Sequence, residues 1–425
     1  MLLEDPKDVR SAQPVRHRPI VVQKYGGSSV ADVDKLGRVA DRIVATRRAG
    51  HDVVAVVSAM GKATDGLLEL AAKVAASGPT DVGVSEPPRR ELDMLVSTGE
   101  RVSMSLLSIA IQARGEDAIS FTGSQCGIIT NDRHFDARII EVRPHRIEDE
   151  LARGRIVIVA GYQGMSYTRE ITTLGRGGTD TTAVALAAAL QADRCEIYSD
   201  VDGVYAADPR AVSEAAHLPE VDYATLQEMA TAGAKVLCAQ AIEWARRAGV
   251  AIYARSTFDP IDGPRRQTLV RKFGPTDAAR VRAVTCSQQV ALVELSDPGR
   301  LGWLLGRLDE GGVPVTEVNV TEKAAMVVLS LQNAPDWEAT RRELEGGDGM
   351  TVRCGVALVS VVGDGLTEEA ATSRSFRRVL DDAGCRPLAI MGSPLRLSAV
   401  VEAARTLEAQ QVLHAAFVSA QPSRG

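Results

Sequence analysis

The chain has 425 residues, of which 45% are apolar, 24% are charged and only 4% are aromatic, and its formal net charge is −6. This length allows two or three domains with a large buried core. The acidic balance and the scarcity of aromatic residues argue against a nucleic-acid partner. Because no apolar run reaches the ~18–20 residues of a membrane span, no membrane partner is expected either.

The N-terminal residues 1–19 are polar and lack the apolar segment of a secretory signal, so we expect a flexible leader. The six cysteines form no CxxC pair, which is typical of reduced thiols and indicates a cytoplasmic protein. The six histidines form neither HxxxH nor HExxH, so no transition-metal site built by the protein is predicted.

Residues 20–272 alternate short β-rich runs with longer helical patterns. Strands are expected at 20–23, 53–58, 156–160, 196–199 and 250–254, and helices at 31–49, 65–76, 91–113, 180–190 and 234–248. This alternation predicts an α/β fold, in which a mainly parallel sheet is covered by helices on both faces. Ligands of such sheets bind at the carboxyl ends of the strands.

The pattern changes after residue 272, where a polar linker leads to two similar units of roughly 65 residues each. Both units have the order strand, helix, strand, strand, helix, and a turn follows each first strand, SDPG in one and GDG in the other. We therefore expect two small α+β domains, one at 273–350 including the linker and one at 351–425. A duplicated module of this kind is suited to ligand binding or assembly.

The first loop with residues suited to ligand binding is KYGGSSV, residues 24–30, directly after the first strand. Gly26 and Gly27 have no Cβ and let an anion approach the backbone N–H groups, while Lys24 supplies a positive charge for a phosphoryl group. Taken alone, the loop is more typical of a simple turn, because strands commonly end in two glycines. Farther along, STGE at 97–100 lies in a helical pattern. There Glu100 is either a surface residue or a group that binds a substrate amine.

A second glycine pair, Gly177 and Gly178, opens an alanine-rich helix in TTLGRGGTDTTAVALAAAL, residues 172–190. Asp180 or a neighbouring threonine can cap this helix, whose N-terminus favours negative charge. Arg176 offers a planar fork for a carboxylate or a phosphate. The apolar run at 183–190 is expected to form one face of the helix.

A third loop, YSDVDGVYAADPR at 198–210, follows a strand and is rich in carboxylates. Its DxDG lacks the other ligands of a calcium loop, so a turn-rich loop around a nucleotide is the better interpretation. Together the loops favour phosphoryl transfer to a small molecule. That chemistry needs cations around the γ-phosphoryl group, Mg²⁺ and an aligned acceptor.

Seven motifs stand in a fixed order: KYGGSSV, VVSAMGKATDGL, STGERVS, SFTGSQCGIIT, TTLGRGGTDTTAVALAAAL, EIYSDVDGVYAADPR and AGAKVL. With them, residues 20–258 resemble the actinobacterial type of aspartokinase, of the amino-acid kinase superfamily. The C-terminal repeat resembles, more loosely, the paired ACT domains of that family. The resemblance implies a three-layer α/β/α catalytic domain at 20–272 and two βαββαβ ACT domains. It also implies ATP-dependent phosphorylation of the L-aspartate side chain to 4-phospho-L-aspartate.

The resemblance also implies roles for individual residues. Lys24 would stabilise the transferring phosphoryl group, and Asp180 would organise the surroundings of the lysine and of Mg²⁺. Glu100 would bind the α-amino group of L-aspartate, and Arg176 a carboxylate. The remaining substrate contacts would be Ser58, Thr64, Gly177, Gly178 and Thr179. The ATP contacts would be Lys24, Tyr25, Gly26, Gly27, Ser199, Asp200, Tyr205, Arg210 and Lys235, and no residue is assigned as a metal ligand.

The C-terminal units depart from this family pattern. Aspartokinases commonly carry a Gln-Asn pair after the second strand of the first ACT domain, which helps to bind lysine and threonine. Here VPVTEVNVTEKAAMVV is shorter and lacks the pair, GLTEEA replaces an HPG turn, and MGSPLRLS replaces a STSEIRIS-like stretch, whereas SDPG at 296–299 is kept. The departure implies weakened feedback by amino-acid effectors at the ACT domains. Sequence drift with inhibition intact is the alternative.

Two rival functions are a kinase of the same fold for glutamate or a related acid, and a non-catalytic sensor of amino acids. The GER and GRGGTD motifs favour aspartate. Retention of Lys24, Glu100, Arg176 and Asp180 weighs against a sensor without catalysis. Because ACT domains usually associate with one another, a homodimer or larger homo-oligomer is expected.

Overall fold

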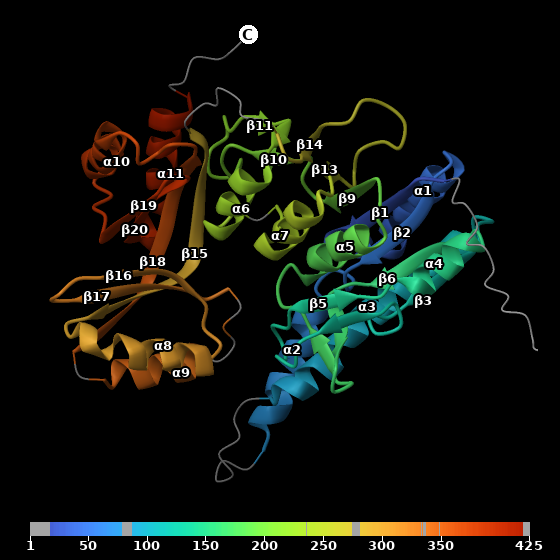
Figure 1. The fold of residues 1–425 in the computed structure, drawn as a ribbon, viewed down its shortest axis with the longest axis horizontal. Coiled ribbons are helices and arrows are strands. Elements are labelled where there is room, and N and C mark those ends of the chain that lie inside the picture. Colours follow the sequence, from blue (N-terminus) through green and yellow to red (C-terminus); the bar gives the residue numbers. More distant parts are fainter. Residues whose placement is uncertain are drawn as a thin grey trace, which may run out of the picture.

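The computed structural model describes residues 18–78, 87–234, 236–273, 281–332, 334, 337–347 and 349–419. Most of the expected leader lies outside these residues. The described part consists of a large α/β region and, at the C-terminal end, a second region built on an antiparallel sheet (Figure 1).

An eight-stranded sheet forms the centre of the α/β region, in the order β12-β14-β13-β9-β1-β2-β6-β3. Its strands are β1 (Ile20–Tyr25), β2 (Asp52–Val57), β3 (Ala118–Phe121), β6 (Ile156–Ala160), β9 (Arg194–Ser199), β12 (Glu220–Val221), β13 (Ile252–Ser256) and β14 (Gln267–Val270). Every neighbouring pair is parallel except β13 with β14. The expected mainly parallel sheet is therefore confirmed.

Helices cover both faces of this sheet, which gives three layers (Figure 1). One face packs against α1 (Val33–Arg48) and α3 (Arg89–Gln112). The other packs against α4 (His145–Ala152), α5 (Gly178–Ala189), α6 (Tyr223–Thr231) and α7 (Ala239–Ala248). Side chains alternate between the faces along each strand. In β1, Val22 lies in the core on the α5 side and Tyr25 in the core on the α1 side.

Smaller elements surround the carboxyl edge of the sheet. A four-stranded sheet has the order β5-β4-β7-β8, and β10 pairs with β11. These elements are the short 3-10 helix η1 (Gly27–Val30), α2 (Ala63–Ala76), β4 (Ile128–Thr130), β5 (Ile139–Val142), β7 (Gln163–Ser166), β8 (Ile171–Thr173), β10 (Val204–Tyr205) and β11 (His217–Leu218).

Three details of the sequence-based helix assignments are wrong. The alanine-rich helix α5 does not bury one face only, because every residue from Gly178 to Ala187 is buried. Asp180 does not cap this helix; Gly177 occupies the N-cap position, and Asp180 lies within the first turn. The helix expected from residue 234 begins at Ala239, because the preceding segment packs against Gly177 through Cys238.

The C-terminal region is a six-stranded antiparallel sheet in the order β16-β17-β15-β18-β20-β19. Its strands are β15 (Val281–Leu295), β16 (Val315–Val320), β17 (Ala325–Ser330), β18 (Met350–Gly363), β19 (Ala389–Ser393) and β20 (Arg396–Glu402). Its helices are α8 (Leu301–Glu310), α9 (Trp337–Glu345), α10 (Ala370–Asp382) and α11 (Thr406–His414), with the short helical turns η3 (Pro298–Arg300), η4 (Ala403–Arg405) and η5 (Ala415–Ser419). Both units show the expected repeat order of elements. They share one sheet, because β15 and β18 pair along most of their length.

The two regions are joined by close packing. The backbone N–H of Val284 in β15 donates to the carbonyl of Ala206 at 2.7 Å. Ala283 and Val362, from β15 and β18, belong to the same hydrophobic cluster as α5, α6 and α7. At the end of α6, a Cβ on Gly233 would collide with the backbone carbonyl of Cys286.

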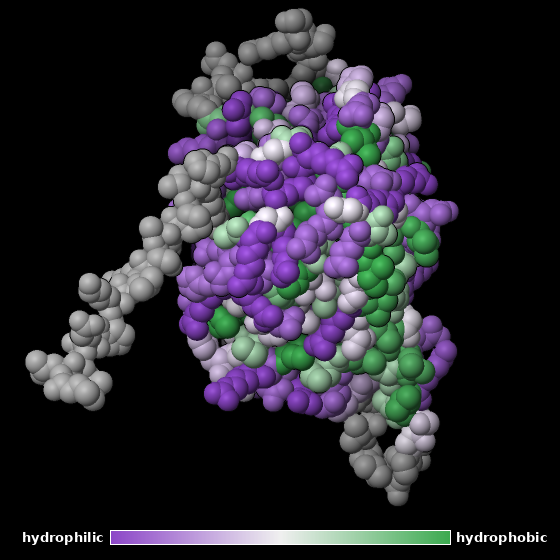
Figure 2. Space-filling view, turned by 90° about the vertical axis from the view of Figure 1, so that its right-hand side faces the viewer, coloured by the Kyte–Doolittle hydropathy of each residue, from purple (hydrophilic) through white to green (hydrophobic). Residues whose placement is uncertain are grey.

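Helix α3 is long and apolar enough to cross a membrane, but half of its most apolar window is buried inside the protein. Figure 2 shows a largely hydrophilic face of the molecule with an apolar band along one side. The exposed apolar side chains of α2 and α3 are Leu70, Val74, Met94, Val102, Leu106 and Ile109. One such helix, half buried in the protein, is weak evidence for a membrane span, because core helices have the same length and composition.

Gly233 and Gly249 provide a matched test of the contact between the two regions. Both have a positive φ, 106° and 70°, but open space surrounds Gly249 whereas Gly233 faces the Cys286 carbonyl. Alanine in a left-handed conformation costs about 1–2 kcal/mol, and overpacking adds about 1–3 kcal/mol. We expect Gly233→Ala to lower the thermal unfolding temperature clearly more than Gly249→Ala does. Equal shifts in calorimetry would contradict tight packing at this contact.

Candidate active site

The candidate site lies at the carboxyl edge of the large sheet, where the loops after β1, β2, β6 and β9 meet. Backbone hydrogen bonds hold these strand ends together. Gly26 N–H donates to the Tyr198 carbonyl at 3.3 Å, and Ser58 N–H donates to the Tyr25 carbonyl at 3.1 Å. The edge is therefore a fixed frame for the side chains that follow each strand.

A buried ion pair joins the two glycine loops. The Nζ atom of Lys24 lies 2.8 Å from Oδ1 of Asp180, and each side chain is only 11% exposed. Lys24 stands in β1 between Val56 and Ile197 and points to the α5 side of the sheet. Asp180 lies in the first turn of α5, two residues after the second glycine pair. The two glycine loops are thus joined in space by opposite charges.

The backbone around these loops leaves no room for a side chain at two of the glycines. A Cβ on Gly27 would lie 2.9 Å from the carbonyl oxygen of Ala59 and 3.0 Å from that of Gly61. Gly177 has a φ of 80°, and a Cβ there would lie 2.5 Å from the Cβ of Cys238. Both loops therefore need glycine, because the backbone packs closely against its neighbours.

The residues expected to contact the acceptor substrate gather beside this ion pair. The hydroxyl of Ser58 donates to that of Thr179 at 3.0 Å. Glu100, in α3, accepts a hydrogen bond from the backbone N–H of Ala59 at 3.1 Å. Thr64 Oγ1 lies 3.9 Å from where a Cβ on Gly99 would stand, which places it next to the Glu100 backbone. Arg176 is exposed, two residues before α5 begins.

Glu100 is held in a nearly dry environment. The residue is 3% exposed, and burial raises the pKa of its carboxyl group from 4.5 to about 7, although backbone hydrogen bonds pull that pKa down. Its second oxygen, Oε2, is buried and has no hydrogen-bond partner among the described residues. A buried carboxylate with one free oxygen is suited to bind a cationic donor.

The residues expected to contact the nucleotide are only partly brought together. Ser199 and Asp200 lie at the end of β9, next to the Gly26 loop. Tyr25 is fully buried on the opposite face from Lys24 and stacks on Tyr198, with ring centroids 4.9 Å apart.

The remaining nucleotide candidates lie farther along the chain. The hydroxyl of Tyr205 donates to Asp202 at 2.7 Å, and Arg210 forms a two-pronged pair with Asp208 at 3.0 and 2.9 Å. Lys235 lies outside the described residues.

Sequence reasoning missed two residues at this edge. Thr257, directly after β13, has its hydroxyl 2.6 Å from that of Ser29 and donates its N–H to the Ser199 carbonyl at 2.9 Å. Tyr162, shortly after β6, has a positive φ of 66°. Burial raises its pKa to about 12, and Glu100 and Arg176 are close enough to influence it. Both residues follow parallel strands, so strand ends were the signal that could have revealed them.

These features define an α/β protein in which a buried ion pair joins two glycine loops next to a buried carboxylate. The model of the amino acid kinase family matches residues 19–256. The aspartokinase of Mycolicibacterium smegmatis is 41% identical over 413 residues, which cover 94% of this chain and 96% of that protein.

Two solved structures of E. coli aspartokinase III also match. The complex with aspartate and ADP (R-state) has a TM-score of 0.79 at 26% identity, covering 93% of this chain and 99% of that one. The complex with lysine and aspartate (T-state) has a TM-score of 0.69 at 27% identity, covering 94% and 99%. The chain therefore belongs to the amino acid kinase family and, within it, to the aspartokinases. Both the resemblance and the fold class inferred from the sequence are confirmed.

The raised pKa of Glu100 predicts a pH-dependent cost to stability. Between pH 4.5 and about 7 the folded protein holds a proton on Glu100 that the unfolded chain releases. The free energy of unfolding therefore falls as the pH rises through this window, by up to about 3 kcal/mol. We expect Glu100→Gln to unfold at a higher temperature than the unsubstituted protein at pH 8, with the gap closing toward pH 4.5. A gap that is independent of pH would contradict this electrostatic origin.

Proposed function

We propose that the protein uses ATP to phosphorylate the side-chain carboxylate of L-aspartate, giving 4-phospho-L-aspartate. The observation that carries the proposal is the Lys24–Asp180 ion pair between two glycine loops, beside the buried Glu100. The E. coli aspartokinase III structure that resembles this chain contains aspartate and ADP.

In this reaction an oxygen of the substrate carboxylate attacks the γ-phosphorus of ATP, a new P–O bond forms, and the bond to ADP breaks. The substrate is itself the nucleophile, so the protein has to supply position and charge. Lys24 places its positive charge where the transferred group would pass between the glycine loops. Asp180 holds the Lys24 ammonium in that place through the 2.8 Å ion pair. Such preorganised charges stabilise the transition state.

The substrate residues divide by charge. The α-ammonium group of aspartate would pair with Glu100, whose Oε2 atom has no partner among the described residues. A cation there favours the ionised carboxyl, so substrate binding would lower the Glu100 pKa. Arg176 would pair with the α-carboxylate, and the linked hydroxyls of Ser58 and Thr179 would orient the acceptor carboxylate.

Mg²⁺ would neutralise charge on the phosphates and align them. Across the described ranges no group of three or more His, Cys, Asp or Glu side chains could hold a metal ion. Magnesium in kinases is commonly bound by substrate phosphates with one or two carboxylates. Asp180, next to both glycine loops, is the carboxylate that fits this role.

The proposal is tested by a hydroxamate assay, which traps the acyl phosphate, with ATP and a panel of acids that includes L-aspartate and L-glutamate. Hydroxamate formed with aspartate, and little with glutamate, is the expected result. Preference for glutamate would instead support a related kinase. No product with any acid would support a non-catalytic sensor.

Lys24→Ala is expected to lower kcat by about 10²-fold or more, the scale observed when one preorganised donor is removed. Lys35→Ala is a suitable control, because Lys35 is a lysine of α1 that pairs with Asp32 on the surface at 3.4 Å. Steady-state kinetics on both variants, after a check of folding by circular dichroism, gives the comparison. Turnover near normal in Lys24→Ala would overturn the assignment.

We further propose that feedback inhibition by lysine and threonine is weak. We also propose that copies of the enzyme associate through the C-terminal sheet and that the enzyme works in the cytoplasm. The family commonly carries an effector-binding polar pair after the strand that corresponds to β16, and in β16 Glu317 is engaged by Arg396. Val318 and Val320 of the same strand are 45% and 51% exposed. The Glu317 carboxylate is thus committed to an internal ion pair, and β16 is an open edge of the sheet that could pair with a second copy.

Loss of polar contacts in an effector pocket costs about 1–3 kcal/mol each, which corresponds to ~5- to 150-fold in affinity. We therefore expect little inhibition by lysine plus threonine at low millimolar concentration. The aspartate kinase assay, run with each effector alone and with both together, measures this. Strong concerted inhibition would show that the substituted pocket still works.

A further inference from the structure

Helix α3 presents a polar stripe to the interior of the protein. Asp93, Ser97 and Glu100 are spaced by four and three residues, so they share one side of the helix, and they are 0%, 0% and 3% exposed. One turn farther, the hydroxyl of Ser103 donates to the Ser58 carbonyl at 2.7 Å. The inner side of a core helix is normally apolar. This one carries buried polar groups from the proposed amine-binding Glu100 back to Asp93.

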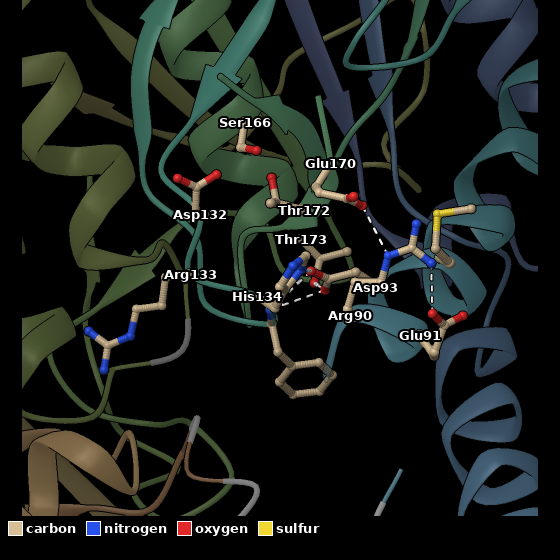
Figure 3. A network of polar contacts seen from close by, with 12 residues as sticks. Arg90, Glu91, Asp93, Asp132, Arg133, His134, Ser166, Glu170, Thr172 and Thr173 are labelled. Atoms are coloured by element: carbon tan, nitrogen blue, oxygen red, sulfur yellow. Dashed lines mark hydrogen bonds and ion pairs between the residues drawn. The ribbon is translucent and has the colours of Figure 1, made fainter. Parts of the chain in front are cut away.

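Asp93 is the centre of a network that involves three separate segments (Figure 3). Its carboxylate accepts hydrogen bonds from the Thr173 hydroxyl at 2.5 Å and from the Phe135 backbone N–H at 3.1 Å. Its other oxygen lies 2.6 Å from Nδ1 of His134. One fully buried carboxylate therefore ties α3 to strand β8 and to the loop between β4 and β5.

The network leads directly to the proposed substrate groups. Thr173 is the last residue of β8, three residues before Arg176. Thr173 lies close to the Tyr162 side chain, and Tyr162 lies near both Glu100 and Arg176. Through α3 and β8, Asp93 is thus connected to both residues that would hold the two ends of the amino-acid backbone.

The loop held by Asp93 is strained. Phe135 has a φ of 69°, which is unfavourable for a bulky side chain. Such a conformation persists only where surrounding contacts enforce it, and strained residues of this kind collect at functional sites. Here the enforcing contact is the bond from Phe135 N–H to the Asp93 carboxylate.

We propose that Asp93 is a positioning residue for the amino-acid side of the active site, holding α3 and β8 so that Glu100 and Arg176 stand at a fixed separation. This inference rests on the proposed function. Asp93 need not touch the substrate; it acts through Thr173, Tyr162 and its own helix.

The test compares Asp93→Asn, Thr173→Val and Thr173→Ser. Asp93→Asn keeps the shape of the side chain but loses one hydrogen-bond acceptor. Thr173→Val keeps the volume of the side chain but loses the hydroxyl donor. Thr173→Ser keeps the hydroxyl donor, so this variant should retain the aspartate KM that Thr173→Val loses. Arg90→Ala is the control, because the exposed Arg90–Glu170 pair, 3.0 Å apart, also links α3 to the segment that enters β8 (Figure 3). KM for aspartate, KM for ATP, kcat and the thermal unfolding temperature are measured for each variant.

We expect Asp93→Asn and Thr173→Val to raise the aspartate KM by about tenfold or more while the ATP KM changes less than about twofold. Thr173→Ser and Arg90→Ala should stay near the unsubstituted protein. If Asp93→Asn fails to fold, the contrast between valine and serine at position 173 decides the question. Unchanged aspartate KM, or equal changes in both KM values, would overturn the positioning role. An unsubstituted protein inactive on aspartate would instead remove the proposed function itself.

Discussion

The active site depends on the ion pair between Lys24 and Asp180. It joins the first strand of the sheet to the first turn of α5 and thereby brings together two glycine loops that are about 150 residues apart in sequence. Removing either partner would leave the other charge buried and unpaired, which is strongly destabilising. The same pair that supports the fold also places a cation at the carboxyl edge of the sheet, where the proposed phosphoryl transfer would need it.

The site keeps a polar surface inside the protein at a cost to stability. Glu100 is nearly dry, and its raised pKa expresses the penalty of ionising a carboxyl there. Asp93 and Ser97 extend this polar surface along α3. Under the proposed function, a substrate ammonium group paired with Glu100 would offset this penalty. Buried polar groups without hydrogen-bond partners lower the stability of the folded protein, and proteins commonly accept this cost at functional sites.

The C-terminal sheet packs directly against the α/β region rather than being attached by a linker alone. Arg396 of β20 pairs with Glu317 of β16 and lies 3.6 Å from Glu228 of α6. At the end of α6, Gly233 packs on β15. A few residues later Cys238 donates to the Gly177 carbonyl at 3.2 Å. A short series of packed contacts therefore connects the C-terminal sheet to the second glycine loop.

The sequence by itself determined the elements and the chemistry that local patterns carry. Alternating apolar runs predicted a mainly parallel sheet, and the glycine pairs after β1 and at the start of α5 predicted loops that an anion could approach, because only glycine allows such close backbone approach. The order of motifs identified the aspartokinases. Local signals could not show that Asp180 pairs with Lys24 instead of capping its helix. They also could not show that α5 is buried on every side.

Only the tertiary structure decided which polar residues share a buried site. Asp93 carries no local signature, and Tyr162 is marked only by its place after a parallel strand. Their neighbours are distant in sequence, because Asp93 is hydrogen-bonded to Thr173 and Phe135, and Tyr162 lies near Glu100. The late start of α7 has the same origin, because Cys238 is held against Gly177. Burial and charge pairing depend on neighbours distant in sequence, whereas helix, strand and turn preferences depend on adjacent residues.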